Sequence, residues 1–129
     1  MSFALKVEDW ELRSKQELRT IMRKVALELF TRIIMRTPVD TGRLRDNWQV
    51  EIGTPSGNVL DRFDPRGQEA INETTSVVER WDGDTAIFLF NNLPYAMAVE
   101  EGWSSQAPQG MVRVTLLEHP QIIEQEVGA

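Results

Sequence analysis

The sequence predicts an α+β fold in which a long N-terminal helix packs on a small, mostly antiparallel sheet with one or two further helices. Three patterns predict it: helical spacing of apolar residues over about 10–36, apolar–polar alternation at 48–52, and an apolar run at 85–90. The chain has 129 residues, of which 41% are hydrophobic and 26% charged. We therefore expect one folded domain, 1–129.

The first helix is expected over about 10–36, because no glycine or proline interrupts this stretch before Pro38. Its apolar stripe consists of Leu18, Ile21, Met22, Val25, Leu29, Phe30 and Ile33. Such a helix is longer than a core of this size needs, so part of the stripe is available to a partner. Alternatively, the helix lies along one face of the sheet and its outer side is solvated.

The chain then turns at 37–48. Asp40 or Thr41 can cap a short helical turn there, and Gly42 permits a tight reversal. From 48 to 52 apolar and polar residues alternate, which predicts a half-buried strand.

An exposed loop is expected at about 53–67, where glycine, proline and aspartate gather and periodicity is lost. Loops of this length are uncommon in compact domains unless they bind something or are disordered. Val59, Leu60 and Phe63 lie among charged residues in this loop, which favours an arm that docks on a partner. The same residues also fit an arm that folds back on its own core, and both interpretations remain open.

A second helix is expected at 68–81, with Gly83 as its left-handed terminator. In the strand that follows, at 85–90, apolar side chains point to both faces. This pattern is typical of a central strand that is covered on both sides, so we expect Phe88 to lie in the core. Trp48 and Trp81 stand in regular elements and are expected in the core as well.

The next segment predicts a turn at Pro94, a short helix that ends at Gly102, and a polar excursion to Pro108. Trp103 follows Gly102 in this excursion and is therefore a candidate interface anchor.

The C-terminal segment, 111–129, fits a helix with a break or kink at Pro120. Alternation at 112–116 also fits a strand, and residues 124–129 are expected to fray.

Composition and charge exclude several classes of function. The chain has no cysteine, which excludes disulfides, thiolate nucleophiles and thiolate zinc sites and suits a reducing cytoplasm. Its 14 basic and 20 acidic side chains give a net charge of −6, which argues against binding DNA through phosphates. Acidic residues near the start interrupt the chain before an apolar segment develops, so we expect no secretion signal. The longest apolar runs, such as 86–90, are too short to span a membrane.

Catalytic and metal-binding patterns are weak. His119 is the single histidine and has no second ligand at helical spacing, and neither Ser104 nor Ser105 stands in a nucleophile elbow. Four acidic residues suggest a divalent cation site, but they are more typical of a solvated or interface surface: Asp82, Asp84, Glu100 and Glu101. We expect no enzymatic activity, no metal and no cofactor.

Two blocks of the chain resemble a known family. The first, Thr-Pro-Val-Asp-Thr-Gly-x-Leu-Arg-x-Asn-Trp, spans 37–48. The second begins with Asn-x-Leu-Pro-Tyr-Ala at 91–96 and continues with Glu100, Gly102, Ser104, Gln106, Ala107-Pro108 and Gly-Met-Val-Arg at 110–113. In their order and separation these blocks are similar to the bacteriophage head–tail connection and tail-completion proteins related to minor tail protein Z. The loop at 53–67 and Pro120 depart from the family pattern.

The resemblance implies a subunit of the virion neck or tail that assembles in the host cytoplasm into a ring with six- or twelve-fold symmetry. Its partners would be copies of itself, head-closure or connector proteins, and tail-terminator or tail-tube proteins, while DNA passes nearby without specific binding. The candidate interface residues are Val59, Leu60, Phe63, Tyr95, Glu100, Trp103, Gln106, Pro108, Met111 and Arg113.

A second class of function is a small cytoplasmic adaptor or regulator that binds one protein partner. The two hypotheses differ in stoichiometry, because an adaptor stays monomeric or dimeric until it meets its partner, whereas a ring subunit associates in larger closed sets.

Overall fold

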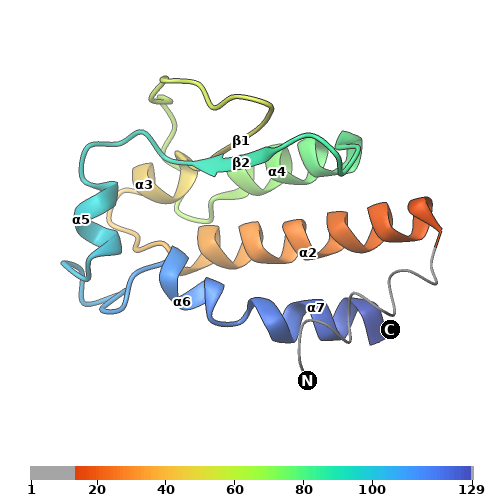
Figure 1. Cartoon of the computed structure of the whole chain (residues 1–129). Coiled ribbons are helices and arrows are strands. Elements are labelled where there is room, and N and C mark those ends of the chain that lie inside the picture. The colour runs from red at the N-terminus through yellow and green to blue at the C-terminus, as the bar shows by residue number, and fades with distance from the viewer. Residues whose placement is uncertain (1–13, 129) are drawn as a thin grey trace.

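The longest helix, α2 (Lys15–Arg36), runs through the middle of the molecule in the computed structural model, which describes residues 14–128 (Figure 1). It begins at Lys15 because Ser14 has an extended backbone and accepts a hydrogen bond from the N–H of Glu17 at 3.1 Å. The helix therefore starts later than the expected residue 10. The expected first turn, which includes Trp10, lies outside the described residues.

Helices cover α2 on two opposite sides (Figure 1). On one side lies α4 (Gln68–Arg80), where Ala26 packs with Val78 and Trp81. On the other lies α7 (His119–Gly128), where Ile21 packs with Ile123 and Val127. Most residues of the predicted stripe thus pack within the chain. That part of the stripe also serves a partner stays a prediction.

The sheet consists of β1 (Gln49–Ile52) and β2 (Ile87–Phe90), which pair antiparallel from Gln49↔Phe90 to Ile52↔Ile87. Ile52 and Ile87 pack against the cluster between α2 and α4. The predicted α+β class is therefore confirmed.

The expected central position of the second strand is wrong. Within residues 14–128 the sheet has two strands, so β2 is an edge strand. Phe88 lies on the face that points away from this core and is 37% exposed. Truncating Phe88 is consequently not expected to open a core cavity.

Three short helices complete the fold: α3 (Arg43–Asp46), α5 (Ala96–Glu100) and α6 (Val112–Leu116). The predicted second helix is confirmed as α4, but the extended backbone of Trp81 ends it at Arg80. Gly83, with φ of 85°, lies in the turn beyond and is not the terminator.

The C-terminal segment is helical, as expected, and its break falls between α6 and α7, just before Pro120. Pro120 occupies the first turn of α7, where a missing N–H costs no helical hydrogen bond. The expected fraying from residue 124 is wrong, since α7 continues to Gly128 and Val127 is 4% exposed. Across residues 14–128, no helix combines the length and apolar character that a membrane crossing requires.

Glu118, in the break between α6 and α7, ties both helices to α2. Its carboxylate accepts hydrogen bonds from Arg36 at 2.5 and 2.8 Å and pairs with Arg32 at 3.2 Å. The hydrogen bonds from Arg36, more than those from Arg32, lower the pKa of Glu118 from 4.5 to about 2.

Glu118 predicts an acid-dependent loss of stability. Because the pKa of Glu118 is lower in the folded state than in the unfolded state, its carboxylate stabilises the fold fully at pH values above 4.5. This stabilisation is lost as the pH falls from 4.5 towards 2. Urea unfolding measured between pH 4.5 and 2 should show that the free energy of unfolding falls more steeply with pH for the wild type than for Glu118→Gln. Glu124→Gln, on the exposed side of α7, should behave like the wild type. Equal slopes for wild type and Glu118→Gln would contradict the role of this carboxylate.

Candidate protein-docking site

The segment 37–48, called the corner below, is held by its own polar side chains. The indole N–H of Trp48 donates to the hydroxyl of Thr37 at 2.7 Å, and this hydroxyl donates to the carbonyl of Ile33 at 2.8 Å. The guanidinium of Arg45 donates to the carbonyls of Met35 and Thr37 at 2.9 and 2.8 Å. It thereby supplies hydrogen-bond donors to carbonyl groups at the C-terminal end of α2, which have no partner within the helix. The residues of the first sequence block therefore have structural roles.

Asp46 and Asn47 are fully buried and fix the loop 53–67, called the arm below, and α4 to the corner. The carboxylate of Asp46 accepts the N–H of Ala70, in the first turn of α4, at 3.1 Å and that of Asp64 at 3.2 Å. The amide oxygen of Asn47 accepts the N–H of Leu60 at 2.7 Å. The arm is thus attached through its backbone and not through its apolar side chains.

Arg62 adds a second attachment, with a side chain that is 10% exposed. It donates to the carbonyls of Asp46 and, at 3.2 Å, Trp48, and it pairs with Glu73 of α4 at 2.5 Å. The arm therefore folds back on its own chain through its backbone and Arg62.

The apolar residues of the arm are not all covered. Leu60 is half-buried, whereas Val59 and Phe63 are 43% and 48% exposed. Phe63 lies under the guanidinium of Arg43, whose carbon is 5.8 Å from the ring centre. The arm holds Phe63 beside the corner with part of its ring open to solvent.

The two sequence blocks meet in space. The side-chain amide of Gln106 accepts the N–H of Val39 at 2.9 Å and donates to its carbonyl at 3.1 Å, as a neighbouring strand would. Asn91 donates to the carbonyl of Leu44 at 2.9 Å. Between the blocks lies an open pocket of about 210 Å³, lined among others by Asp40, Thr41 and Tyr95.

Glu100, at the end of α5, closes the loop 101–110, called the Trp103 loop below. Its carboxylate accepts the backbone N–H groups of Met111, Val112 and Arg113 at 2.9, 2.8 and 3.0 Å, and so caps α6. Burial raises the pKa of Glu100, but these hydrogen bonds and the charge of Arg113 outweigh burial, so the net shift is downward.

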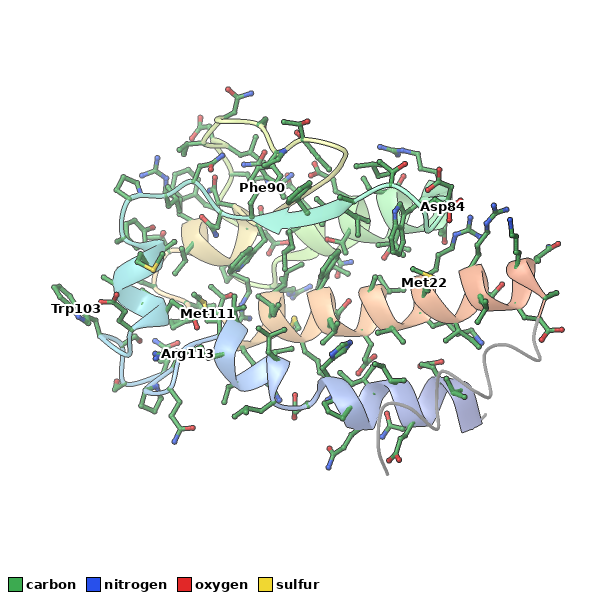
Figure 2. All side chains as sticks on the ribbon, in the orientation of Figure 1. Met22, Asp84, Phe90, Trp103, Met111 and Arg113 are labelled. Atoms are coloured by element: carbon green, nitrogen blue, oxygen red, sulfur yellow. The ribbon has the colours of Figure 1, made fainter. Side chains whose placement is uncertain are left out.

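Two glycines make the Trp103 loop tight. A Cβ at Gly102 would lie 2.5 Å from the carbonyl oxygen of Pro108, and one at Gly110 would lie 2.4 Å from that of Glu100. Trp103 stands on this closely packed loop with 81% of its surface exposed, and Figure 2 shows it pointing away from the rest of the chain. The loop thus presents a large aromatic side chain from a fixed backbone.

The predicted interface residues divide into three groups. Seven are exposed: Val59, Phe63, Tyr95, Trp103, Gln106, Pro108 and Arg113. Leu60 and Glu100 are half-buried and hold their own loops in place. Met111 is 1% exposed and packs in the core with Ile34 and Trp48, so its assignment to an interface is corrected.

Of the four exposed aromatic residues that the structure describes, Phe63 lies against the corner and Tyr95 and Trp103 lie at α5 and on the Trp103 loop, whereas Phe88 lies on β2. We call the surface of Phe63, Tyr95, Met97 and Trp103 the corner end, because Phe63 lies against Arg43 of the corner and the others belong to α5 and the Trp103 loop. Helices α3 and α5 lie near each other in Figure 1. The side chains of the corner end come from segments far apart in the sequence, which the hydrogen bonds of the corner bring together.

Sequence reasoning missed four exposed apolar residues: Met35, Met97, Leu116 and Leu117, at 47%, 67%, 54% and 79% exposure. Leu116 and Leu117 carried a signal, because consecutive residues of a helix do not face the same core. Met97 carried none, since helical spacing alone does not tell which side of α5 is covered.

The acidic residues considered for a cation site do not come together. Asp84 lies at one end of the molecule and the Trp103 loop, next to Glu100 and Glu101, at the other (Figure 2). No group of three or more potential metal ligands occurs in the part of the chain that the structure describes.

Comparison with known proteins identifies a family. Residues 3–102 match a family model described as the bacteriophage HK97-gp10-like family, a candidate tail component. The match contains the whole corner and α5, and it ends before α6. Searches of curated proteins and of solved structures found no match.

Proposed function

Because this chain belongs to the bacteriophage HK97-gp10-like family of tail components, we propose that it is a structural subunit of a neck or tail-completion ring that joins head and tail. The observation that carries the proposal is Trp103, which is 81% exposed on a loop closed by Glu100. A large exposed aromatic side chain is typical of an interface anchor. A loop that is already ordered loses little conformational entropy on binding.

The proposed partners are copies of this chain, arranged in a ring of six- or twelve-fold symmetry, together with a head-closure or connector protein and a tail-terminator or tail-tube protein. Ring closure needs two different surfaces on each subunit, and the corner end is the proposed first surface. In this role the chain performs no catalysis and resides in the virion after assembly in the host cytoplasm. Its net charge of −6 would disfavour adhesion of passing DNA.

Electron microscopy of particles made without this protein tests the proposal. We expect filled heads and free tails that fail to join. Intact, infectious virions would remove the neck assignment.

The role of Trp103 has its own test. Trp103→Ala should fold with unchanged stability, since the side chain contributes little to the core, but should lose about 2 kcal/mol or more of docking free energy. Quantitative immunoblotting of purified particles should therefore find much less of this variant than of the wild type. Leu117→Ala, which removes an equally exposed side chain outside the corner end, is the control. Normal incorporation of Trp103→Ala would remove the corner end from the proposed interface.

A further inference from the structure

One edge of the sheet has no partner within residues 14–128. The N–H of Gly53 donates to the carbonyl of Ala86 at 2.8 Å, which continues the pairing of β1 with β2. Hydrogen-bonded pairs alternate along antiparallel strands, so Phe88 and Phe90 bond to β1. The N–H and C=O groups of Ile87 and Leu89 therefore point to the other edge of β2, where no segment of residues 14–128 pairs with them.

The corresponding edge of β1 is shielded. Arg62 donates to the carbonyl of Trp48, directly before β1, and the side chain of Gln49 donates to Asn58 of the arm at 2.8 Å. Helix α4 packs beside this strand, as Figure 1 shows. Proteins usually protect an edge strand with charges, prolines or bulges. β2, with the sequence Ile-Phe-Leu-Phe, carries none of these.

Charge favours a second copy as the occupant of this edge. Residues 85–99 contain no charged side chain, in a chain that is 26% charged and has a net charge of −6. Two copies carry the same net charge, but along β2 they would meet without like charges in contact. The strand also presents apolar side chains on both faces, which suits an inner strand of a larger sheet.

We propose that β2 pairs antiparallel with β2 of a second copy, about a twofold axis through Phe88. In this arrangement Ile87 and Leu89 of one copy exchange backbone hydrogen bonds with Leu89 and Ile87 of the other. The two Phe88 side chains then face each other in a non-hydrogen-bonded pair, the closer type of cross-strand pair. The two sheets then form a single four-stranded sheet, and neither copy retains an unpaired β2 edge.

This pairing uses none of the corner-end residues. Because it joins two identical surfaces about a twofold axis, it is separate from the head-to-tail contact that closes a ring, and it would link pairs of subunits or two rings. It rests on the proposed function only in that the chain associates with itself. Four strands with one apolar face are also more stable than an isolated pair of strands.

Cysteine cross-linking tests the pairing directly, because the natural chain has no cysteine. Across a non-hydrogen-bonded pair the Cα atoms are about 4.5 Å apart, within the range that a disulfide spans. Phe88→Cys should therefore form a disulfide-linked dimer under mild oxidation, seen by non-reducing electrophoresis.

Glu51→Cys is the matched control. Glu51 is opposite Phe88 on the same face of the sheet but one strand further from the free edge. In the proposed pair the two positions 51 would be three strand spacings apart, about 14 Å, which is too far for a disulfide. Dimer formation by Phe88→Cys should be roughly tenfold faster or more, reflecting its higher effective concentration.

The other outcomes overturn the proposal. Equal rates for the two variants would mean random collision or face-to-face stacking of two sheets. A mixed dimer of Phe88→Cys with Glu51→Cys that forms faster than either homodimer would place β1 of the second copy at this edge. The proposed function has a separate readout, since intact virions made without the chain would remove it whatever the cross-linking result.

Discussion

Asp46→Ala is expected to destabilise the fold by about 3–5 kcal/mol, the loss typical of removing one partner from a buried, hydrogen-bonded charge. Asp46 is 0% exposed and accepts the N–H groups of Ala70 and Asp64, and its carboxylate lies 3.8 Å from Arg62. Alanine leaves these donors without their acceptor in a place that water does not reach. Urea unfolding measures this loss of stability as a shift of the urea midpoint, provided that the slope of the free energy against urea concentration is unchanged.

Two variants separate the causes. Asp46→Asn keeps the size and one acceptor oxygen but removes the charge, so it should lose less stability than Asp46→Ala. Asp61→Ala removes an exposed carboxylate from the same arm and should stay within about 0.5 kcal/mol of the wild type. A similarly small effect for Asp46→Ala would mean that the arm and α4 do not depend on this residue.

Gly42→Ala is the second variant with a large expected effect, roughly 2–5 kcal/mol from left-handed backbone strain and overpacking together. Gly42 has φ of 91°, and an added Cβ would lie 2.4 Å from the carbonyl oxygen of Phe63 and 2.5 Å from the nitrogen of Pro65. Both atoms are backbone, so the arm itself has to move away from the corner.

Gly53→Ala provides the comparison for Gly42→Ala. Its φ of 95° gives a similar conformational cost, but nothing lies within 4 Å of the added Cβ. The stability difference between the two variants, measured by urea unfolding, isolates the clash with the arm. Equal losses would show that the arm is free to shift and that the corner does not fix it.

The sequence was sufficient for the helices, because helical periodicity is local. The run to Arg36 and the helix at 68–80 follow from it, whereas in the C-terminal segment the spacing also fitted a strand at 112–116. The number of strands could not be predicted from the sequence. An apolar run predicts that both faces of β2 are covered, but it does not say whether the same chain supplies the cover.

The exposure of Trp103 was predicted, but the contacts that hold its loop and the corner were not. Exposed Trp103 follows from its place after Gly102 in a polar excursion, as expected. The roles of Asp46, Asn47 and Glu100 did not follow, because each bonds to backbone groups distant in the sequence. A buried acid has no sequence signature of its own until its partners are known.

The most direct test of the central claim is a cryo-electron microscopy map of the assembled particle in which this chain is located and the surroundings of Trp103 are seen. We predict copies at the junction of head and tail, with Trp103 buried against a neighbouring subunit. A particle in which Trp103 still faces solvent in every copy, or which lacks the chain, would contradict it.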